Sequence, residues 1–122
     1  MKKTKIKWLN KSQKHDYPAA QSFLCLHFEP RVAKNLTNKL KRAKMTEFAA
    51  KGIFRASGLS LLGVSNSHVQ KDRSQIILNT SLSPLLLCRD KGGGKLIIAD
   101  GYHRLCAVYT FDEDAMIPCK IV

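Results

Sequence analysis

Residues 95–104 read KLIIADGYHR, and they indicate where a buried strand changes into a helix. The apolar run from Lys95 to Ala99 is typical of a buried strand. After it, over residues 101–111, apolar side chains recur at helical spacing, namely Leu105, Cys106, Val108 and Tyr109. We therefore expect the polar residues in between to lie at the junction of a strand and a helix.

Such a junction is suited to binding an anion. The first backbone N–H groups of a helix have no partner inside the helix, and the helix dipole adds partial positive charge beside them. Gly101 would let a ligand approach the backbone, while His103 and Arg104 offer donors that suit phosphate oxygens. The sequence therefore predicts a phosphate site at the start of this helix.

Each residue of the predicted site also has a structural interpretation. Asp100 either caps the helix or, beside a phosphate, contacts a metal ion or takes a proton. Gly101 serves a tight turn, His103 makes a structural hydrogen bond, and Arg104 pairs with the acidic loop at residues 112–114. The other three histidines, His15, His27 and His68, stand alone in the sequence and suggest no role.

The surrounding pattern predicts an α+β domain. Residues 30–44 form an amphipathic helix with Pro30 in its first turn and an apolar face of Val32, Leu36, Leu40 and Ala43. Residues 19–28 have strand or short-helix character. The remaining predicted elements are a strand from Glu47 to Arg55, a packed loop from Ala56 to Ser65, a helix capped by Ser65, Asn66 or Ser67 and running to about Leu78, a strand from Leu85 to Cys88, a glycine-rich turn from Arg89 to Gly94, and a closing strand from Met116 to Val122.

The charge is concentrated in the first half of the chain. Residues 1–55 contain 14 Lys/Arg and three Asp/Glu, a net +11, whereas residues 56–122 contain seven and six, a net +1. Such a field favours a polyanion, so residues 1–44 are a candidate nucleic-acid surface, and a solvated lysine face is the alternative. We expect residues 1–45, a basic arm and the amphipathic helix, to pack on a domain formed by residues 46–122. The arm, with Trp8 in it, is either flexible or an edge strand.

The cysteines and the hydropathy indicate a cytoplasmic protein. The four cysteines, Cys25, Cys88, Cys106 and Cys119, form no CxxC pair and are expected to be buried reduced thiols. The spacing of Cys25 and His27 gives no support to a zinc site. The basic N-terminus lacks the apolar core of a signal peptide, and no later run is long enough to span a membrane.

The order of these elements, the string Gly101-Tyr102-His103-Arg104 after Asp100, and the closing strand together resemble the ParB/sulfiredoxin superfamily over residues 46–122. The resemblance implies a small mixed sheet and a helix start that holds the phosphates of ATP or CTP, with Mg²⁺. A weaker correspondence, Ile53-Phe54-Arg55, looks like the strand that ends in an arginine in sulfiredoxins. It implies that Lys51, Arg55 and Ser57 face the phosphates from the opposite wall.

Two departures from the superfamily narrow the function. Tyr102 stands at the position of the sulfiredoxin catalytic cysteine, and Cys106, one turn later, is expected to face the core. The sequence reaches Val122 without a helix-turn-helix module, and we expect none beyond it. We therefore expect neither sulfiredoxin activity nor a complete ParB partition function.

Three functions remain after this comparison. The first is nucleotide binding, with phosphoryl transfer or hydrolysis that would use Asp100 as metal ligand or base and His103 as a catalytic group, and with Gly101, Tyr102, His103 and Arg104 around the phosphate. The second is a non-specific DNA-binding or nuclease-like module. The third is an interaction protein that keeps the fold without the chemistry. The sequence does not indicate the oligomeric state.

Overall fold

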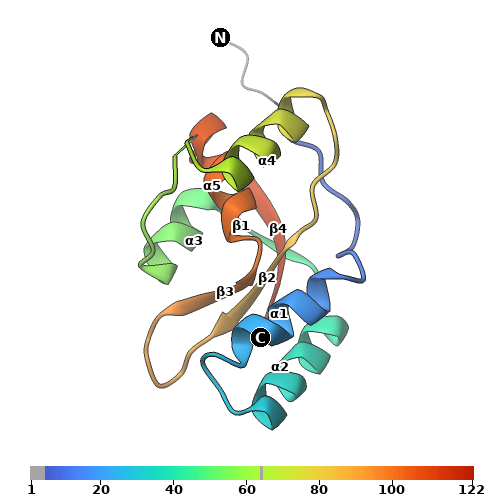
Figure 1. The fold of residues 1–122 in the computed structure, drawn as a ribbon, viewed down its shortest axis with the longest axis vertical. Helices are drawn as coiled ribbons and strands as arrows, with labels where there is room; N and C mark the ends of the chain where they lie inside the picture. Colours follow the sequence, from blue (N-terminus) through green and yellow to red (C-terminus); the bar gives the residue numbers. More distant parts are fainter. Residues whose placement is uncertain (1–4, 64) are drawn as a thin grey trace.

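The computed structural model describes residues 5–63 and 65–122, and Figure 1 shows their arrangement. Five helices and four strands form one α+β domain in this range. The elements are α1 (Asp16–Leu24), α2 (Pro30–Arg42), β1 (Thr46–Ala49), α3 (Ala50–Ser57), α4 (Ser67–Ile77), β2 (Leu85–Arg89), β3 (Leu96–Asp100), α5 (Tyr102–Phe111) and β4 (Met116–Ile121). None of the helices in these two ranges is long and apolar enough to cross a membrane.

The four strands form one mixed sheet in the order β1-β4-β2-β3. β4 pairs antiparallel with β1 and parallel with β2, and β2 forms an antiparallel hairpin with β3. Residues 85–88 of β2 are all buried, because helices cover this strand on both faces. The hairpin places the end of β3, and with it the start of α5, beside the start of β2.

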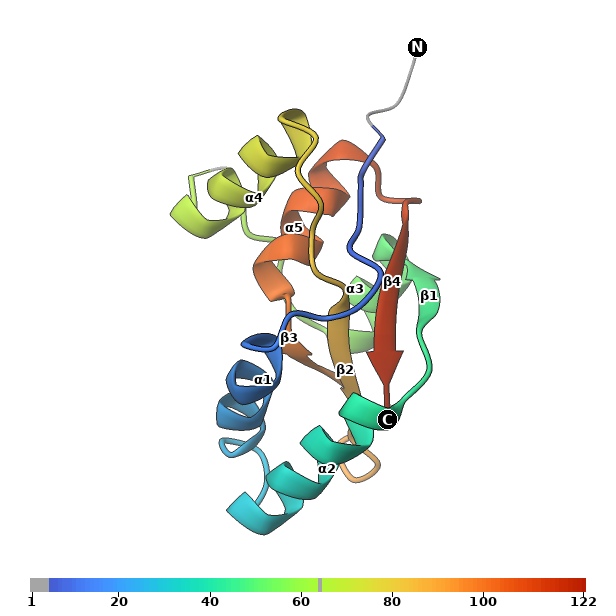
Figure 2. The ribbon, with the colours of Figure 1, turned by 90° about the vertical axis from the view of Figure 1, so that its right-hand side faces the viewer.

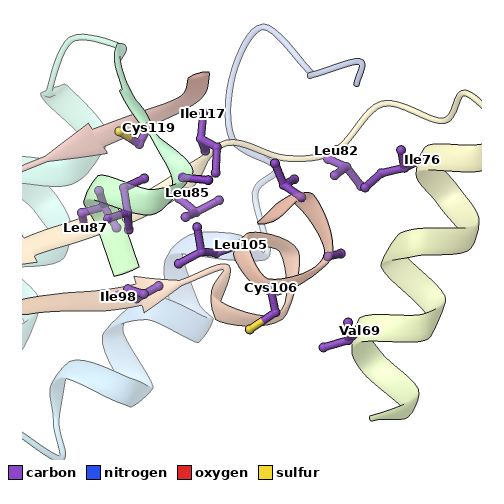
Figure 3. Close-up of a cluster of buried hydrophobic side chains, with 14 residues drawn as sticks. Val69, Ile76, Leu82, Leu85, Leu87, Ile98, Leu105, Cys106, Ile117 and Cys119 are labelled. Carbon is purple, nitrogen blue, oxygen red and sulfur yellow. The ribbon is translucent and has the colours of Figure 1, made fainter. Parts of the chain in front are cut away.

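Helices α3 and α5 pack on one face of the sheet, and α4 lies on the same side as an outer layer. Leu85 and Leu87 point to this face, where Leu105 and Val108 of α5 are fully buried against them. Helix α4 packs on α5 from outside, and Figure 3 shows its Val69 pointing toward Cys106. Helix α5 therefore lies between the sheet and α4. Its first turn, residues 102–104, is partly exposed to solvent.

Helices α1 and α2 pack on the other face, where Leu86 and Cys88 point. Both views show this pair at the opposite end of the molecule from α4 (Figures 1 and 2). The buried Lys120 of β4 connects the layers, because its Nζ donates to Tyr17 Oη at 3.1 Å and to the backbone oxygen of Lys41 at 3.0 Å.

The amphipathic helix is confirmed as α2, with Pro30 in its first turn, but its buried face is rotated from the expected one. Val32 is 39% exposed, and the buried positions are Ala33, Thr37 and Leu40. The Thr37 hydroxyl donates to the backbone oxygen of Ala33 at 2.8 Å, which satisfies its polar group inside the protein. Because threonine is polar, the sequence pattern did not place Thr37 on the buried face, and the expected apolar face was rotated as a result.

The predicted strand from Glu47 to Arg55 is wrong in its second half. Strand β1 ends at Ala49, and α3 begins at Ala50, whose amide donates to the Ala115 oxygen at 2.9 Å; the next amide, of Lys51, donates to the Glu113 oxygen at 2.9 Å. These carbonyls take up the unpaired amides of a helix start. Ile53-Phe54-Arg55 is therefore helical, which removes the correspondence with the arginine-ended strand of sulfiredoxins.

Most other predicted elements are confirmed. Asn66 caps α4, its Oδ1 accepting from the amides of His68 and Val69 at 3.0 and 3.2 Å. The strands β2, β3 and β4 and the helix α5 lie where the sequence places them, and residues 19–28 contribute most of α1 rather than a strand. The Arg89–Gly94 turn joins β2 to β3.

Three expectations need correction or completion. The expected packed loop is shorter, because α3 takes Ala56 and Ser57, and it is only partly packed, since Leu59 and Leu61 are 47% and 46% exposed. Cys25 is exposed, unlike the other three cysteines. Near the N-terminus, the Leu9 amide donates to the Leu82 oxygen at 2.8 Å, so this part of the arm is extended and paired. Residues 1–4 of the arm and residue 64 of the loop lie outside the described residues.

Candidate functional site

The turn from β3 into α5 is built around Gly101. Its φ is +109°, a conformation that L side chains rarely adopt. A Cβ added there would lie 2.7 Å from Leu85 Cγ and 3.0 Å from Arg104 Nη2. The space over Gly101 is thus filled by side chains of the protein itself, so the glycine serves the turn and its packing rather than an open approach for a ligand.

The first turn of α5 presents uncapped amides. Its first helical hydrogen bond runs from the Leu105 amide to the Gly101 oxygen at 2.9 Å, so the amides of Tyr102, His103 and Arg104 precede it. Gly101 is the N-cap, and no side chain of the described residues caps this helix. The expectation that Asp100 caps the helix is therefore wrong, because it lies one residue too early.

Arg104 is held by Asp100. Its Nη2 donates to Asp100 Oδ2 at 2.7 Å and to the Pro84 oxygen at 3.3 Å, and the two side chains are 17% and 16% exposed. The partner is thus not the acidic loop at residues 112–114. Burial raises the pKa of Asp100, and the Arg104 charge opposes that rise. Arg104 Nε is buried without a hydrogen-bond partner in the part of the chain that the structure describes.

A cleft of about 220 Å³ opens between the first turn of α5 and the first half of α4. We call it the α4–α5 cleft; it is lined by residues 100–104 and by His68, Lys71 and Asp72. The rings of His68 and His103 lie with their centroids 4.9 Å apart across it. Helix α4 is therefore the wall opposite the predicted phosphate site.

The three residues from α4 were missed in the sequence. His68 and Asp72 are one helical turn apart, so they lie on the same face of α4. Asp72 also falls between Val69 and Ile76, the two buried residues of that helix. A carboxylate at this position of an otherwise apolar stripe indicated that the Asp72 side chain faces the interior of the protein rather than solvent.

The charges in the cleft balance each other. Lys71 and Arg104 are opposed by Asp72 and Asp100, so the net charge depends on the two histidines. Burial lowers the pKa of His103, the His68 charge lowers it further, and Asp72 opposes the shift. Burial raises the pKa of Asp72, against the charges of Arg104 and His103. The neutral form of the His103 imidazole is therefore favoured more strongly than in a free histidine.

Tyr102 and Cys106 have structural roles: the first fastens a loop, and the second is buried in the core. The Tyr102 hydroxyl donates to the backbone oxygen of Ser60 and so fastens the loop after α3 to α5. Burial raises the pKa of both the Tyr102 phenol and the Cys106 thiol. Neither group is thus prepared to act as a nucleophile.

Lys51, Arg55 and Ser57 do not line the α4–α5 cleft. The Lys51 ammonium pairs with Asp114, and Arg55 is exposed on the surface of α3. The buried Ser57 hydroxyl donates to the Phe54 oxygen at 3.0 Å and accepts from the Leu59 amide at 3.2 Å. The structure therefore does not bring these residues to the start of α5.

The residues of the cleft do not form a metal site by themselves. No group of three His, Cys, Asp or Glu in residues 5–63 and 65–122 has the geometry to hold an ion. Asp100, the predicted metal ligand, gives one carboxylate oxygen to Arg104. A role for Mg²⁺ would therefore depend on oxygens supplied by a ligand.

Comparisons with known proteins add no family to this description. The chain matches no protein-family model, no curated protein and no solved structure. The resemblance to the ParB/sulfiredoxin superfamily accordingly stays a prediction.

Proposed function

We propose that the protein binds a phosphate-bearing ligand of the ATP or CTP type, with a phosphate on the first turn of α5 in the α4–α5 cleft. One observation carries the proposal: the uncapped amides of residues 102–104 belong to the same turn that lines a polar cleft with two facing imidazoles. A helix start offers donors and partial positive charge to an anion. His68, Lys71 and His103 would complete the seat.

The role of Arg104 in this proposal differs from the one expected. Because its guanidinium is already paired with Asp100, its main effect is to neutralise the carboxylate nearest the phosphate. The amides and imidazoles would then make the direct contacts. A bound phosphate would oppose the burial that lowers the pKa of His103, so binding would strengthen as the pH falls and this imidazole gains its charge.

Phosphoryl transfer or hydrolysis would require a base, and His103 is the better candidate of the two catalytic residues expected. Burial lowers its pKa, which favours the neutral imidazole that can accept a proton. This is the opposite protonation state from the one that would strengthen binding, so the reaction should be favoured at higher pH and binding at lower pH. Asp100 is occupied by Arg104. Release of phosphate from ATP or CTP, compared between the wild type and His103→Gln, tests this step.

Calorimetric titration with ATP and CTP, with and without Mg²⁺ and at pH 6 and 7.5, tests the binding proposal. We expect His103→Gln to weaken binding about tenfold at pH 6, as loss of a charged hydrogen bond does, and to weaken it less at pH 7.5. His68→Gln should also weaken binding at pH 6, because it removes a hydrogen-bonding group from the opposite wall of the cleft. Lys51→Ala is the matched control away from the cleft. Equal affinity in the wild type and both histidine variants at pH 6 would remove the assignment.

A second candidate function is duplex DNA binding by residues 1–44. It is favoured by α2, which carries no acidic residue and has five exposed cations, Arg31, Lys34, Lys39, Lys41 and Arg42. Each phosphate contact made by such a cation steepens the salt dependence of affinity by about 0.9 in the log–log slope. Fluorescence anisotropy on a duplex should show a shallower slope for Lys34→Gln/Lys39→Gln. An unchanged slope would count against α2 as the contact surface.

A further inference from the structure

A second, larger recess lies on the sheet face that α3 and α5 share. It has a volume of about 640 Å³ and lies between α3 and the β2–β3 hairpin. Figure 1 shows this hairpin extending beyond α5, so the helix does not cover the last part of the sheet. We call this recess the α3–hairpin groove; its floor comes from Leu96 and Ile121 of the sheet and from Ile53 at the base of the α3 wall.

The floor and the α3 wall are apolar. Phe48 is 41% exposed beside the groove, and Ala56 adds to the α3 wall. Gly52 lines the groove from α3, and a Cβ added to it would meet no atom within 4 Å. The groove therefore has open space next to exposed apolar surface, which water solvates poorly.

The hairpin side of the groove is basic. Arg89, Lys91 and Lys95 are exposed there, and none of them belongs to an ion pair among residues 5–63 and 65–122. The one carboxylate of the lining, Asp90, accepts a hydrogen bond from the Gly92 amide at 3.2 Å. Three cations against one carboxylate leave an excess positive charge at one end of an apolar trough.

We propose that this groove binds a small organic anion with an apolar chain, of the fatty-acid type. The chain would lie on Ile53, Leu96 and Ile121, and the carboxylate would face Lys95 and Arg89. The volume falls within the roughly 300–1,000 Å³ of small-molecule sites. The cations at one end and the apolar floor match a ligand that has an anionic head and an apolar chain. The volume and the charge thus fit a small amphipathic anion.

The groove is separate from the α4–α5 cleft. Leu96 begins β3 and Asp100 ends it, so at about 3.3 Å per residue the strand separates the two recesses by roughly 13 Å. The groove also shares no lining residue with the cleft. Binding at one is therefore measurable without binding at the other.

Titration of the intact protein with decanoate, followed by calorimetry below the concentration at which decanoate forms micelles, tests the proposal. Gly52→Leu should fill the groove and abolish binding. Gly52→Ala is the matched control, because it alters the same position of α3, adds only one carbon and removes a glycine from a helix interior. Decanoate binding by the wild type and Gly52→Ala but not by Gly52→Leu supports the site. Equal binding by all three proteins, or none by the wild type, overturns it.

A second titration tests whether Lys95 and Arg89 recognise the carboxylate of the ligand. Lys95→Gln/Arg89→Gln should weaken decanoate binding about tenfold, as loss of hydrogen bonds to a charged group does, and should leave the binding of 1-decanol unchanged. Equal losses for the acid and the alcohol would show that the cations do not recognise the head group, and would overturn this assignment of the ligand class.

Discussion

The α4–α5 cleft and the α3–hairpin groove lie at opposite ends of strand β3. Positive and negative side chains balance in the cleft, whereas the groove carries an excess of positive charge. In the cleft, the Arg104 guanidinium and the Asp100 carboxylate neutralise each other, so the proposed anion would be contacted by the amides and the histidines. In the groove, Arg89, Lys91 and Lys95 form no ion pair with any residue that the structure describes, and the floor is apolar. The difference follows from the fold, because a helix starts at one end of β3 and a solvent-exposed turn precedes the other.

The glycines of the two recesses should give the largest contrast. Gly101→Ala forces a Cβ into Leu85 and a side chain into a left-handed conformation, so we expect a loss of about 4 kcal/mol in the free energy of unfolding from strain and overpacking. Gly52→Ala meets no atom within 4 Å and should raise it by about 0.5–1 kcal/mol. Urea unfolding followed by circular dichroism measures both. A Gly101→Ala protein that loses less than about 1 kcal/mol, the low end of the roughly 1–3 kcal/mol that strain alone costs, would contradict this account of the turn.

The second-largest effect on stability is expected from the ion pair between Asp100 and Arg104 in the cleft. Asp100→Asn leaves the Arg104 charge 17% exposed and without its carboxylate, and we expect a loss of about 2 kcal/mol, less than for a fully buried pair. Arg104→Gln in the same protein should recover part of this loss, because the pair is coupled. A double-mutant cycle measures the coupling. Additive effects of the two substitutions would show that the cleft is not self-neutralised.

The histidine side of the cleft should respond to pH. Burial lowers the pKa of His103 in the folded protein, below its unfolded value of about 6.5. Folding therefore disfavours the imidazolium, so this contribution to stability is complete above that pH and declines as the pH falls through it. The affinity for ATP should change in the opposite direction and rise over the same window. Urea midpoints of the wild type and His103→Gln between pH 7.5 and 5.5 test the first trend; parallel curves for the two proteins would contradict it.

The elements that the sequence predicted correctly are those with local signals. The start of α4 carries an Asn66 cap, and the start of α2 carries Pro30. Residues 95–111 change from a buried run to helical spacing within the chain itself. Such signals need no partner from elsewhere in the molecule.

The errors have non-local causes. Residues 50–55 are helical because the carbonyls of Ala115 and Glu113 accept the first amides of α3, and these lie more than 60 residues away. For the same reason only the α5 wall of the cleft was predicted. The α4 wall is set by packing between two helices, although the spacing of Asp72 from Val69 and Ile76 showed an acid on a buried face. The pairing of Asp100 with Arg104 also depends on the fold, because Asp100 lies in β3 and the turn at Gly101 brings it to the Arg104 side chain.

The smallest expected effect is on ATP binding by variants of α3. It tests whether the wall opposite the phosphate is α3, as the sequence suggested, or α4, as in the structure. Lys51→Ala and Arg55→Ala remove cations that the resemblance placed opposite the phosphate but that do not line the cleft. We expect both variants to bind ATP as the wild type does, while His68→Gln, on α4, weakens binding at pH 6. Calorimetry on the three variants under one buffer condition makes the comparison. Because Lys51 pairs with Asp114 at the surface of the protein, its loss should leave folding unchanged, so weaker binding by Lys51→Ala with normal binding by His68→Gln would assign the ligand to α3 instead.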